Sequence, residues 1–293
     1  NNLEAGLAAY TRAVALNPSD ARVFFELDQL QKKCNMPPLE RLNRLEAQAE
    51  LVSQRDDLTI EQITLLNIVG RYQDALALLL SRNFHPWEGG EGKVTGQYIL
   101  SLVEIAKTEM ARVDYSAAVT YLQRALIFPE SLGEGKLQGS QDNNIHYYLG
   151  CAYESLAQHD LARTHLEKAS IGLSEPTSPM FYNDQPPDMI YYQGKALEKL
   201  GRDAEANAIF NRLITYGNSH LNDHIQIDYF AVSLPDFLVF DEDLDKRNRI
   251  HCHYMIMLGL LGLNKQSEAM QQVDIILSLN AYHIGATTHT IGL

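Results

Sequence analysis

Apolar residues recur along the chain at helical spacing, and one short pattern of them returns several times. In each copy a small residue is followed four positions later by a large apolar or aromatic residue, which places both side chains on one helix face. The copies are centred on Ala75, Ala118, Ala162, Ala206 and Ala269, and a half-copy covers residues 6–13. The pattern predicts a series of helices that pack against one another through small residues.

The copies are separated by a nearly constant number of residues, which indicates a repeat. The first three intervals are 43, 44 and 44 positions, and the fourth is 63 positions. A helix-interior glycine also recurs, at Gly150 and Gly194, where it costs about 1 kcal/mol relative to alanine and therefore suggests a close approach of two backbones. Loops rich in glycine, proline, serine and acidic residues are expected at 88–96, 130–142 and 174–188, and a larger insertion at 216–247.

These residues resemble the tetratricopeptide repeat (TPR), a helix-turn-helix unit of about 34 residues. The resemblance implies an all-α fold, a right-handed α-solenoid of TPR-like helix-turn-helix repeats with long inter-repeat loops. A generic helical bundle is the alternative, but bundles do not reproduce one short pattern at fixed intervals. We expect a single helical-repeat domain over residues 1–293, divided into a half repeat (1–20), an atypical repeat (21–56), regular repeats (57–215), the insertion (216–247) and a C-terminal repeat (248–293).

Composition narrows the compartment and the partners. The 293 residues carry a formal net charge of -13, so phosphate backbones and anionic lipid would repel the chain, and we expect neither a nucleic acid nor a membrane as partner. Three widely separated cysteines favour a reducing compartment, and no apolar run is long enough for a membrane helix, which predicts a cytoplasmic protein. The chain does not begin with methionine, which favours an internal piece of a longer protein.

One loop holds the densest set of candidate binding residues, Trp87, Glu88, Glu91 and Lys93. An exposed indole beside carboxylates is a suitable platform for a sugar. The interpretation that we favour is a long turn between repeats, in which Trp87 fills the seam between neighbouring helix pairs. Both carboxylates belong to one flexible loop, whereas a catalytic pair is usually held by separate rigid elements, so no catalytic residue is assigned.

Two further clusters suggest a metal site but lack the required spacing. The acidic end of segment 228–243 has no glycine at the position that a calcium loop needs. His251 and His253, with His220 and His224 four positions apart, suggest a metal site, but His251 and His253 point to opposite sides of a helix and cannot bind one ion from the same face. We therefore expect no metal and no cofactor, and we interpret these residues as a helix-starting acidic turn and as core or interface histidines.

In helical repeats the partner usually binds the concave wall, which is lined by the first helix of each pair. Alignment of the repeats on Gly150 and Gly194 places six residues there: Asn144, Tyr147, Glu154, Tyr191, Lys195 and Lys199. This mixed aromatic and charged surface suits a peptide or another domain. The Lys/Asn set with which tetratricopeptide proteins clamp a C-terminal carboxylate is not reproduced in full, which argues against a chaperone-tail partner.

The sequence motifs at 85–92 and 228–236 resemble the C-terminal half of large bacterial tetratricopeptide-repeat proteins. In these proteins a β-sandwich domain of unknown function, similar to galactose-mutarotase folds, precedes the repeats. The resemblance implies an intracellular bacterial protein linked to carbohydrate metabolism.

We expect a non-catalytic scaffold that docks against its own N-terminal domain or against another protein. The alternative is part of a carbohydrate-active enzyme, in which the Trp87 loop completes a sugar-binding or glycoside-processing site of the missing N-terminal domain. A third, weaker hypothesis is metal binding near His251.

Overall fold

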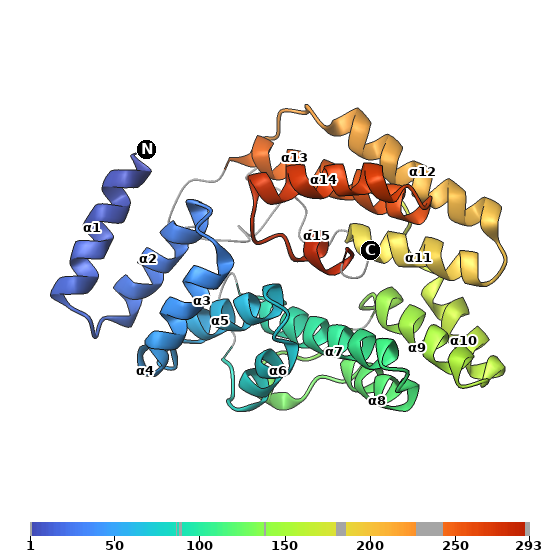
Figure 1. Cartoon of the computed structure of the whole chain (residues 1–293), viewed down its shortest axis with the longest axis horizontal. Coiled ribbons are helices and arrows are strands. Elements are labelled where there is room, and N and C mark those ends of the chain that lie inside the picture. Colours follow the sequence, from blue (N-terminus) through green and yellow to red (C-terminus); the bar gives the residue numbers. More distant parts are fainter. Residues whose placement is uncertain are drawn as a thin grey trace.

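The computed structural model describes residues 2–85, 87, 90–137, 139–179, 186–226 and 243–290. Within these ranges the chain forms fifteen α-helices and one short 3-10 helix, and no strand (Figure 1). The first eight helices are α1 (Leu3–Leu16), α2 (Ala21–Lys33), α3 (Pro38–Ala47), α4 (Ala49–Val52), α5 (Asp56–Ile68), α6 (Tyr72–Leu80), α7 (Lys93–Ala111) and α8 (Tyr115–Ala125). The others are η1 (Glu130–Leu132), α9 (Asn143–Ser155), α10 (His159–Ala169), α11 (Pro187–Lys199), α12 (Asp203–His220), α13 (Leu244–Gly262), α14 (Gln266–Leu279) and α15 (Ile284–Thr288). The fold is an α-solenoid of helix-turn-helix repeats, which confirms the fold class predicted from the sequence.

Five successive helical hairpins form the regular part of the stack: α5–α6, α7–α8, α9–α10, α11–α12 and α13–α14. Each hairpin closes with a three-residue turn whose middle residue has a positive φ, between 57° and 80°. The middle residues are Gly70, Val113, Ala157, Gly201 and Asn264. The residue after each of them donates its N–H to a carbonyl five residues earlier, as Arg71 does to Leu66 at 2.8 Å. This Schellman geometry ends the first helix of each hairpin without leaving its last carbonyls unpaired.

The recurring small residues lie where the helices cross. The alanines of all five copies are at most 4% exposed, and the large residues four positions later are equally buried. Each such apolar side chain contributes about 1.5–3 kcal/mol by leaving water. Gly150 and Gly194 have the same role in the first helices. A Cβ at Gly150 would lie 2.6 Å from the side chain of Leu166, and one at Gly194 would lie 2.4 Å from the ring of Phe210. The close approach predicted from these glycines is therefore a contact with a side chain of the paired helix.

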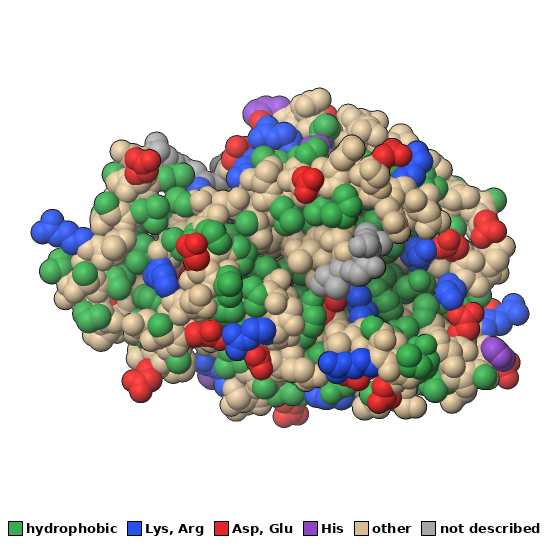
Figure 2. Space-filling model, viewed as in Figure 1, with side chains coloured by type: hydrophobic (Ala, Val, Ile, Leu, Met, Phe, Trp, Pro, Cys, Tyr) green, Lys and Arg blue, Asp and Glu red, His purple; other side chains and the backbone are tan. Residues whose placement is uncertain are grey.

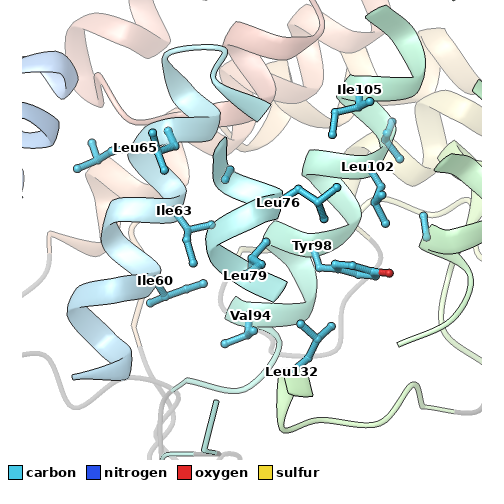
Figure 3. Close-up of a cluster of buried hydrophobic side chains, with 14 of the residues drawn as sticks. Ile60, Ile63, Leu65, Leu76, Leu79, Val94, Tyr98, Leu102, Ile105 and Leu132 are labelled. Carbon is cyan, nitrogen blue, oxygen red and sulfur yellow. The ribbon is translucent and has the colours of Figure 1, made fainter. Parts of the chain in front are cut away.

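The first helices of the hairpins contact one another in order, α5 with α7, α7 with α9, α9 with α11 and α11 with α13. They form the inner side of a curved stack, and we call this surface the inner wall. Apolar side chains of α5, α6 and α7 fill the space between neighbouring hairpins, as Ile63, Leu79 and Leu102 do in Figure 3. A second cluster continues the core through α11 to α14.

The helices at the edge of the long insertion extend into it from both sides. Helix α12 continues to His220 and α13 begins at Leu244, so the interruption between the helices is shorter than the range 216–247. Asp243 caps α13 by accepting a hydrogen bond from the N–H of Lys246 at 2.8 Å. Most of the run at 228–243, with Asp241 and Glu242, lies outside the described residues.

The chain does not end at the last hairpin. After α14 it turns inward, and the short helix α15 lies within the curve of the stack, in contact with α5 on one side and α13 on the other (Figure 1). This return brings the last repeat against the first helices of the chain. Among the described residues, no helix is both long and apolar enough to cross a membrane.

Candidate interaction surface

Tyrosines of three successive inner helices lie close together, four of them in ring contact and the fifth, Tyr254, connected to them through the ring of His289. The tyrosine wall consists of Tyr147 and Tyr148 on α9, Tyr191 and Tyr192 on α11, and Tyr254 on α13. Tyr192 is its centre, with ring centroids 5.5 Å from Tyr147, 5.5 Å from Tyr148 and 5.3 Å from Tyr191. The two pairs stand 44 positions apart in the sequence, so equivalent positions of two repeats meet across the inner wall.

The phenol groups of this wall are neutral. Burial raises the pKa of Tyr191 to about 12 and raises the pKa values of Tyr147 and Tyr148 above their usual range. The hydroxyls of Tyr148 and Tyr192 share a hydrogen bond of 3.2 Å. The wall therefore offers ring faces and edges with a few hydroxyls, which suits an amphipathic or uncharged protein segment.

Charged residues of the same two helices lie at the rim of the wall. Lys199 of α11 forms an ion pair of 2.6 Å with Glu154 of α9, and Lys195 pairs with Glu198 one turn along its own helix. Asn144 stands in the first turn of α9, where its side-chain oxygen accepts the N–H of Ile145 at 2.8 Å. The structure thus brings Tyr147 and Tyr191 together through Tyr192, and Glu154 and Lys199 directly. An exposed pair of this kind adds at most about 1 kcal/mol to stability, which leaves it available to a partner.

The loop around Trp87 is attached to the repeat stack. Trp87 is half-buried and packs against the main core, and its indole lies so close to Gly90 that a Cβ there would be 2.1 Å from the ring. The end of the loop is held by Glu134, which accepts the N–H of Gly92 at 3.0 Å and 3.1 Å. Trp87 therefore packs on the core of the stack, and its place in the seam between neighbouring helix pairs stays a prediction. Glu91 is exposed, Lys93 begins α7, and Glu88 lies outside the described residues.

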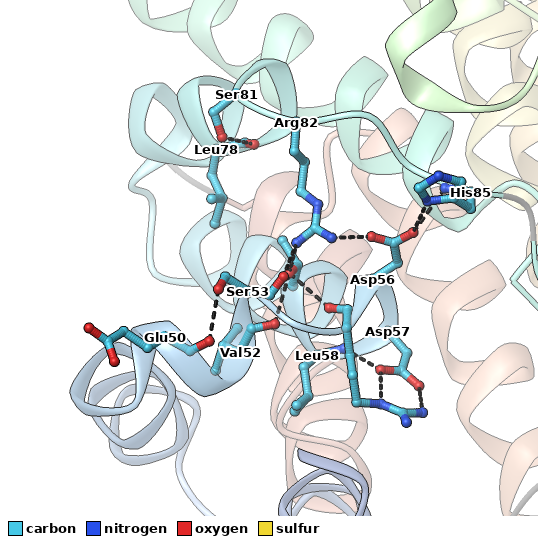
Figure 4. A network of polar contacts seen from close by, with 12 residues as sticks. Glu50, Val52, Ser53, Asp56, Asp57, Leu58, Leu78, Ser81, Arg82 and His85 are labelled. Atoms are coloured by element: carbon cyan, nitrogen blue, oxygen red, sulfur yellow. Dashed lines mark hydrogen bonds and ion pairs between the residues drawn. The ribbon is translucent and has the colours of Figure 1, made fainter. Parts of the chain in front are cut away.

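The start of the same loop is fixed by a polar network at the first turn of α5 (Figure 4). The carboxylate of Asp56 pairs with Arg82 and accepts the backbone N–H of His85 at 2.9 Å. Arg82 also donates to the hydroxyl of Thr59 at 2.6 Å and to the carbonyl of Ser53 at 3.1 Å. These contacts fix the start of the loop. The two side chains that make them, Asp56 and Arg82, are already paired with each other.

The histidines considered as metal ligands bind to separate partners. His251 donates from Nε2 to the carbonyl of Thr177 at 2.8 Å, and His253 lies 2.7 Å from the amide oxygen of Gln272. His220 and His224 pair with different aspartates. Among the described residues, no group of three or more His, Cys, Asp or Glu side chains could hold a metal ion.

The tyrosine wall is covered by a segment that sequence reasoning did not place there. The ring of His289 lies 5.3 Å from Tyr191, 5.5 Å from Tyr192 and 6.2 Å from Tyr254. Burial, together with the nearby charge of Lys107, lowers the pKa of His289 to about 3. The one signal in the sequence is that residues 281–290 contain no Asp, Glu, Lys or Arg, which is unusual for a segment that faces water.

Figure 2 shows one face of the molecule, on which apolar side chains lie between the two arms of the curve and acidic and basic side chains are scattered around them. The arms are the α5–α8 side and the α11–α14 side of the stack (Figure 1).

Comparison with known proteins gives one family match and one solved structure. A family model described as tetratricopeptide repeat matches residues 188–216, which cover most of the α11–α12 hairpin. The chain is also similar to a protein whose structure is titled "Crystal structure of YrrB: a TPR protein with an unusual peptide-binding site". The identity is 15%, the match covers 97% of this chain and 98% of that chain, and the TM-score is 0.25. A superposition this loose supports no conclusion about shared geometry.

Proposed function

We propose that this chain is a non-catalytic docking module that binds a protein segment along its inner wall. The observation that supports this most directly is the tyrosine wall, a buried aromatic surface built from equivalent positions of successive repeats and already covered by a protein segment. The tetratricopeptide match at 188–216 includes α11, the central helix of that wall.

The chemistry of the wall favours a protein partner. Tyrosine is enriched at protein interfaces because it offers a large contact area at a low cost in conformational entropy. The rim pair Lys199–Glu154 supplies both charges beside an apolar centre, which is the usual arrangement of an apolar interface core with a polar rim. Asn144, Lys195 and the ring faces of Tyr147 and Tyr191 complete the proposed contact surface.

We propose two sources for the partner segment, a further domain of the same polypeptide and a separate protein in the cytoplasm. The whole of residues 1–293 acts as one helical-repeat domain in this proposal. A link to bacterial carbohydrate metabolism stays a prediction from the sequence resemblance. The same holds for a carbohydrate as the alternative partner. No described contact favours the alternative sugar site, because the ring of Trp87 is engaged by Gly90 and the core.

Site-directed photo-crosslinking in the full-length protein tests this function. A photoreactive residue at Lys199, on the inner wall, is expected to form adducts with a protein or with another domain. The matched control is a photoreactive residue at Arg163, an exposed position on α10, the second helix of its hairpin. Tyr147→Ala in the Lys199 variant should reduce the yield at least fivefold, because it removes part of the wall. Equal yields at Lys199 and Arg163, or no effect of Tyr147→Ala, would contradict the proposal.

A further inference from the structure

Residues 281–290 form an uncharged segment that crosses the inner side of the stack. We call it the inner segment. It follows α14 directly and includes α15, and it joins elements that are far apart in the sequence. At its start, Asn35 from the α2–α3 turn accepts the N–H of Ala281 at 2.8 Å. At its end, Thr288 and His289 reach α7 and α11.

Two hydrogen bonds from side chains of the stack go to peptide groups of the inner segment. Asn35 accepts the N–H of Ala281 at 2.8 Å. Lys107 donates to the carbonyl of Thr288 at 2.9 Å. Because every residue has a backbone carbonyl and nearly every residue an N–H, these bonds do not depend on which side chains the bound segment carries. Asn35 and Lys107 would hold a different segment in the same way.

Selectivity comes from the fit of three residues against the wall. A Cβ at Gly285 would lie 2.3 Å from the hydroxyl of Tyr254, so the segment approaches this tyrosine only with glycine at that place. Ala286 is fully buried, which limits its side chain to a methyl group. The ring of His289 lies beside Tyr191, Tyr192 and Tyr254.

The inner segment has little conformational stability of its own. Helix α15 has five residues, far fewer than the 12–15 that an isolated helix needs for marginal stability in water. Its conformation is therefore maintained by contacts with the wall. Its tether to α14 supplies an effective concentration on the order of millimolar, so it occupies the wall without high intrinsic affinity.

We propose that the tyrosine wall is a receptor for a short uncharged segment with the pattern Gly-Ala-x-x-His, that residues 281–290 are its internal occupant, and that a partner segment of the same chemistry binds by displacing them. This inference rests on the proposed docking function and deepens it, because it names the class of segment that the wall accepts. The partner enters as one helical turn of small residues with an imidazole ring at its end.

Binding of a labelled peptide in trans tests the exchange. The peptide carries residues 280–290 of this chain. Gly285→Val in the protein should displace the inner segment from Tyr254 and let the peptide bind at least tenfold more tightly than to the unaltered protein. Gly135→Val is the matched control, because a Cβ at Gly135 meets nothing within 4 Å. A peptide with valine at its glycine position should not bind either protein.

Each outcome of this experiment has a definite meaning. Tenfold tighter binding to the Gly285→Val protein alone supports the proposal. Equal binding to the Gly285→Val and Gly135→Val proteins, or no binding to a Gly285→Val protein whose circular dichroism matches that of the unaltered protein, overturns it.

Hydrogen exchange of the unaltered protein provides a test that does not depend on a variant. Amides of α15 should exchange at least tenfold faster than those of α13, because the inner segment opens without unfolding of the stack. Equal protection of α15 and α13 would overturn the proposal. Failure here is distinguishable from failure of the docking function, because adducts at Lys199 that depend on Tyr147 would still support docking.

Discussion

Val113 occupies a left-handed backbone position, with φ of 66°, in the turn between α7 and α8. A non-glycine residue in this conformation costs about 1–2 kcal/mol, and a β-branched residue adopts it least readily. The equivalent residue of two other hairpins is glycine, Gly70 and Gly201, which has no such penalty. Val113 is 70% exposed, so no buried contact compensates for the strain.

We therefore predict that Val113→Gly stabilises the protein. The relief of strain exceeds the extra backbone entropy of glycine in the unfolded chain by about 0.5–1 kcal/mol. The free energy of unfolding from urea denaturation measures the change. The reverse substitution, Gly201→Val at the equivalent turn, should destabilise by a similar amount. A loss of stability in Val113→Gly would show that the turn is not strained.

At the scale of the element, two helices pair closely because one of them has a glycine at the contact. In the α11–α12 hairpin the ring of Phe210 occupies the space above Gly194. We predict that Gly194→Ala destabilises by about 1–2 kcal/mol, because overpacking outweighs the gain in helix propensity. Gly96→Ala, also inside a helix but with nothing within 4 Å, should instead stabilise by up to about 1 kcal/mol. Thermal unfolding of both variants gives the comparison, and shifts in the same direction would refute the argument.

The helical hairpins could be predicted from the sequence because their signal is local and repeated. Ala118 and Leu122 lie on one helix face whatever surrounds them, and the 44-residue interval shows that the unit returns. The turns were harder to predict, because two of them have Val113 and Ala157 at the positive-φ position, where a glycine would have indicated the end of the helix. The register of the repeats placed Glu154 and Lys199 on the same wall, and the structure adds that they form an ion pair.

The inner segment could not be predicted in this way. His289 meets Tyr191 and Tyr192 through a return of the chain across several repeats, and no short pattern encodes such a contact. For Trp87 a packing role is the interpretation that the sequence favours, but its close contact with Gly90 could not be predicted from the sequence.

At the scale of the whole molecule, the inner segment converts an open stack into a closed one. Repeats in an open solenoid contact only their neighbours, so distant repeats affect one another only through the repeats between them. Here Tyr282 packs at 4.8 Å on the guanidinium of Arg41, a fully buried residue of α3, and its hydroxyl binds the carbonyl of Met36. Arg41 is itself paired with Asp28 and Glu61. Burial alone would raise the pKa of Glu61, but Lys32 and Arg41 lower it to about 2. Tyr282 of the inner segment thus rests on a charged network of α2, α3 and α5, which couples this segment to the opposite side of the stack.

This closure makes stability depend on pH through the histidines of the inner segment. Burial lowers the pKa of His283 to about 4 and that of His289 to about 3; the neighbouring basic group is His251 for His283, and the neighbouring basic groups are Lys107 and His283 for His289. The unfolded chain, with histidine pKa values near 6.5, binds more protons than the folded chain between about pH 3 and 6.5, so stability should fall as the pH falls through that window. Urea midpoints at pH 7, 6, 5 and 4 measure the slope. His289→Gln should flatten it, whereas His159→Gln, at an exposed position of α10, should not. Identical slopes for the two variants would mean that the inner segment does not exclude the imidazolium, and that the ends of the stack are not coupled through His289.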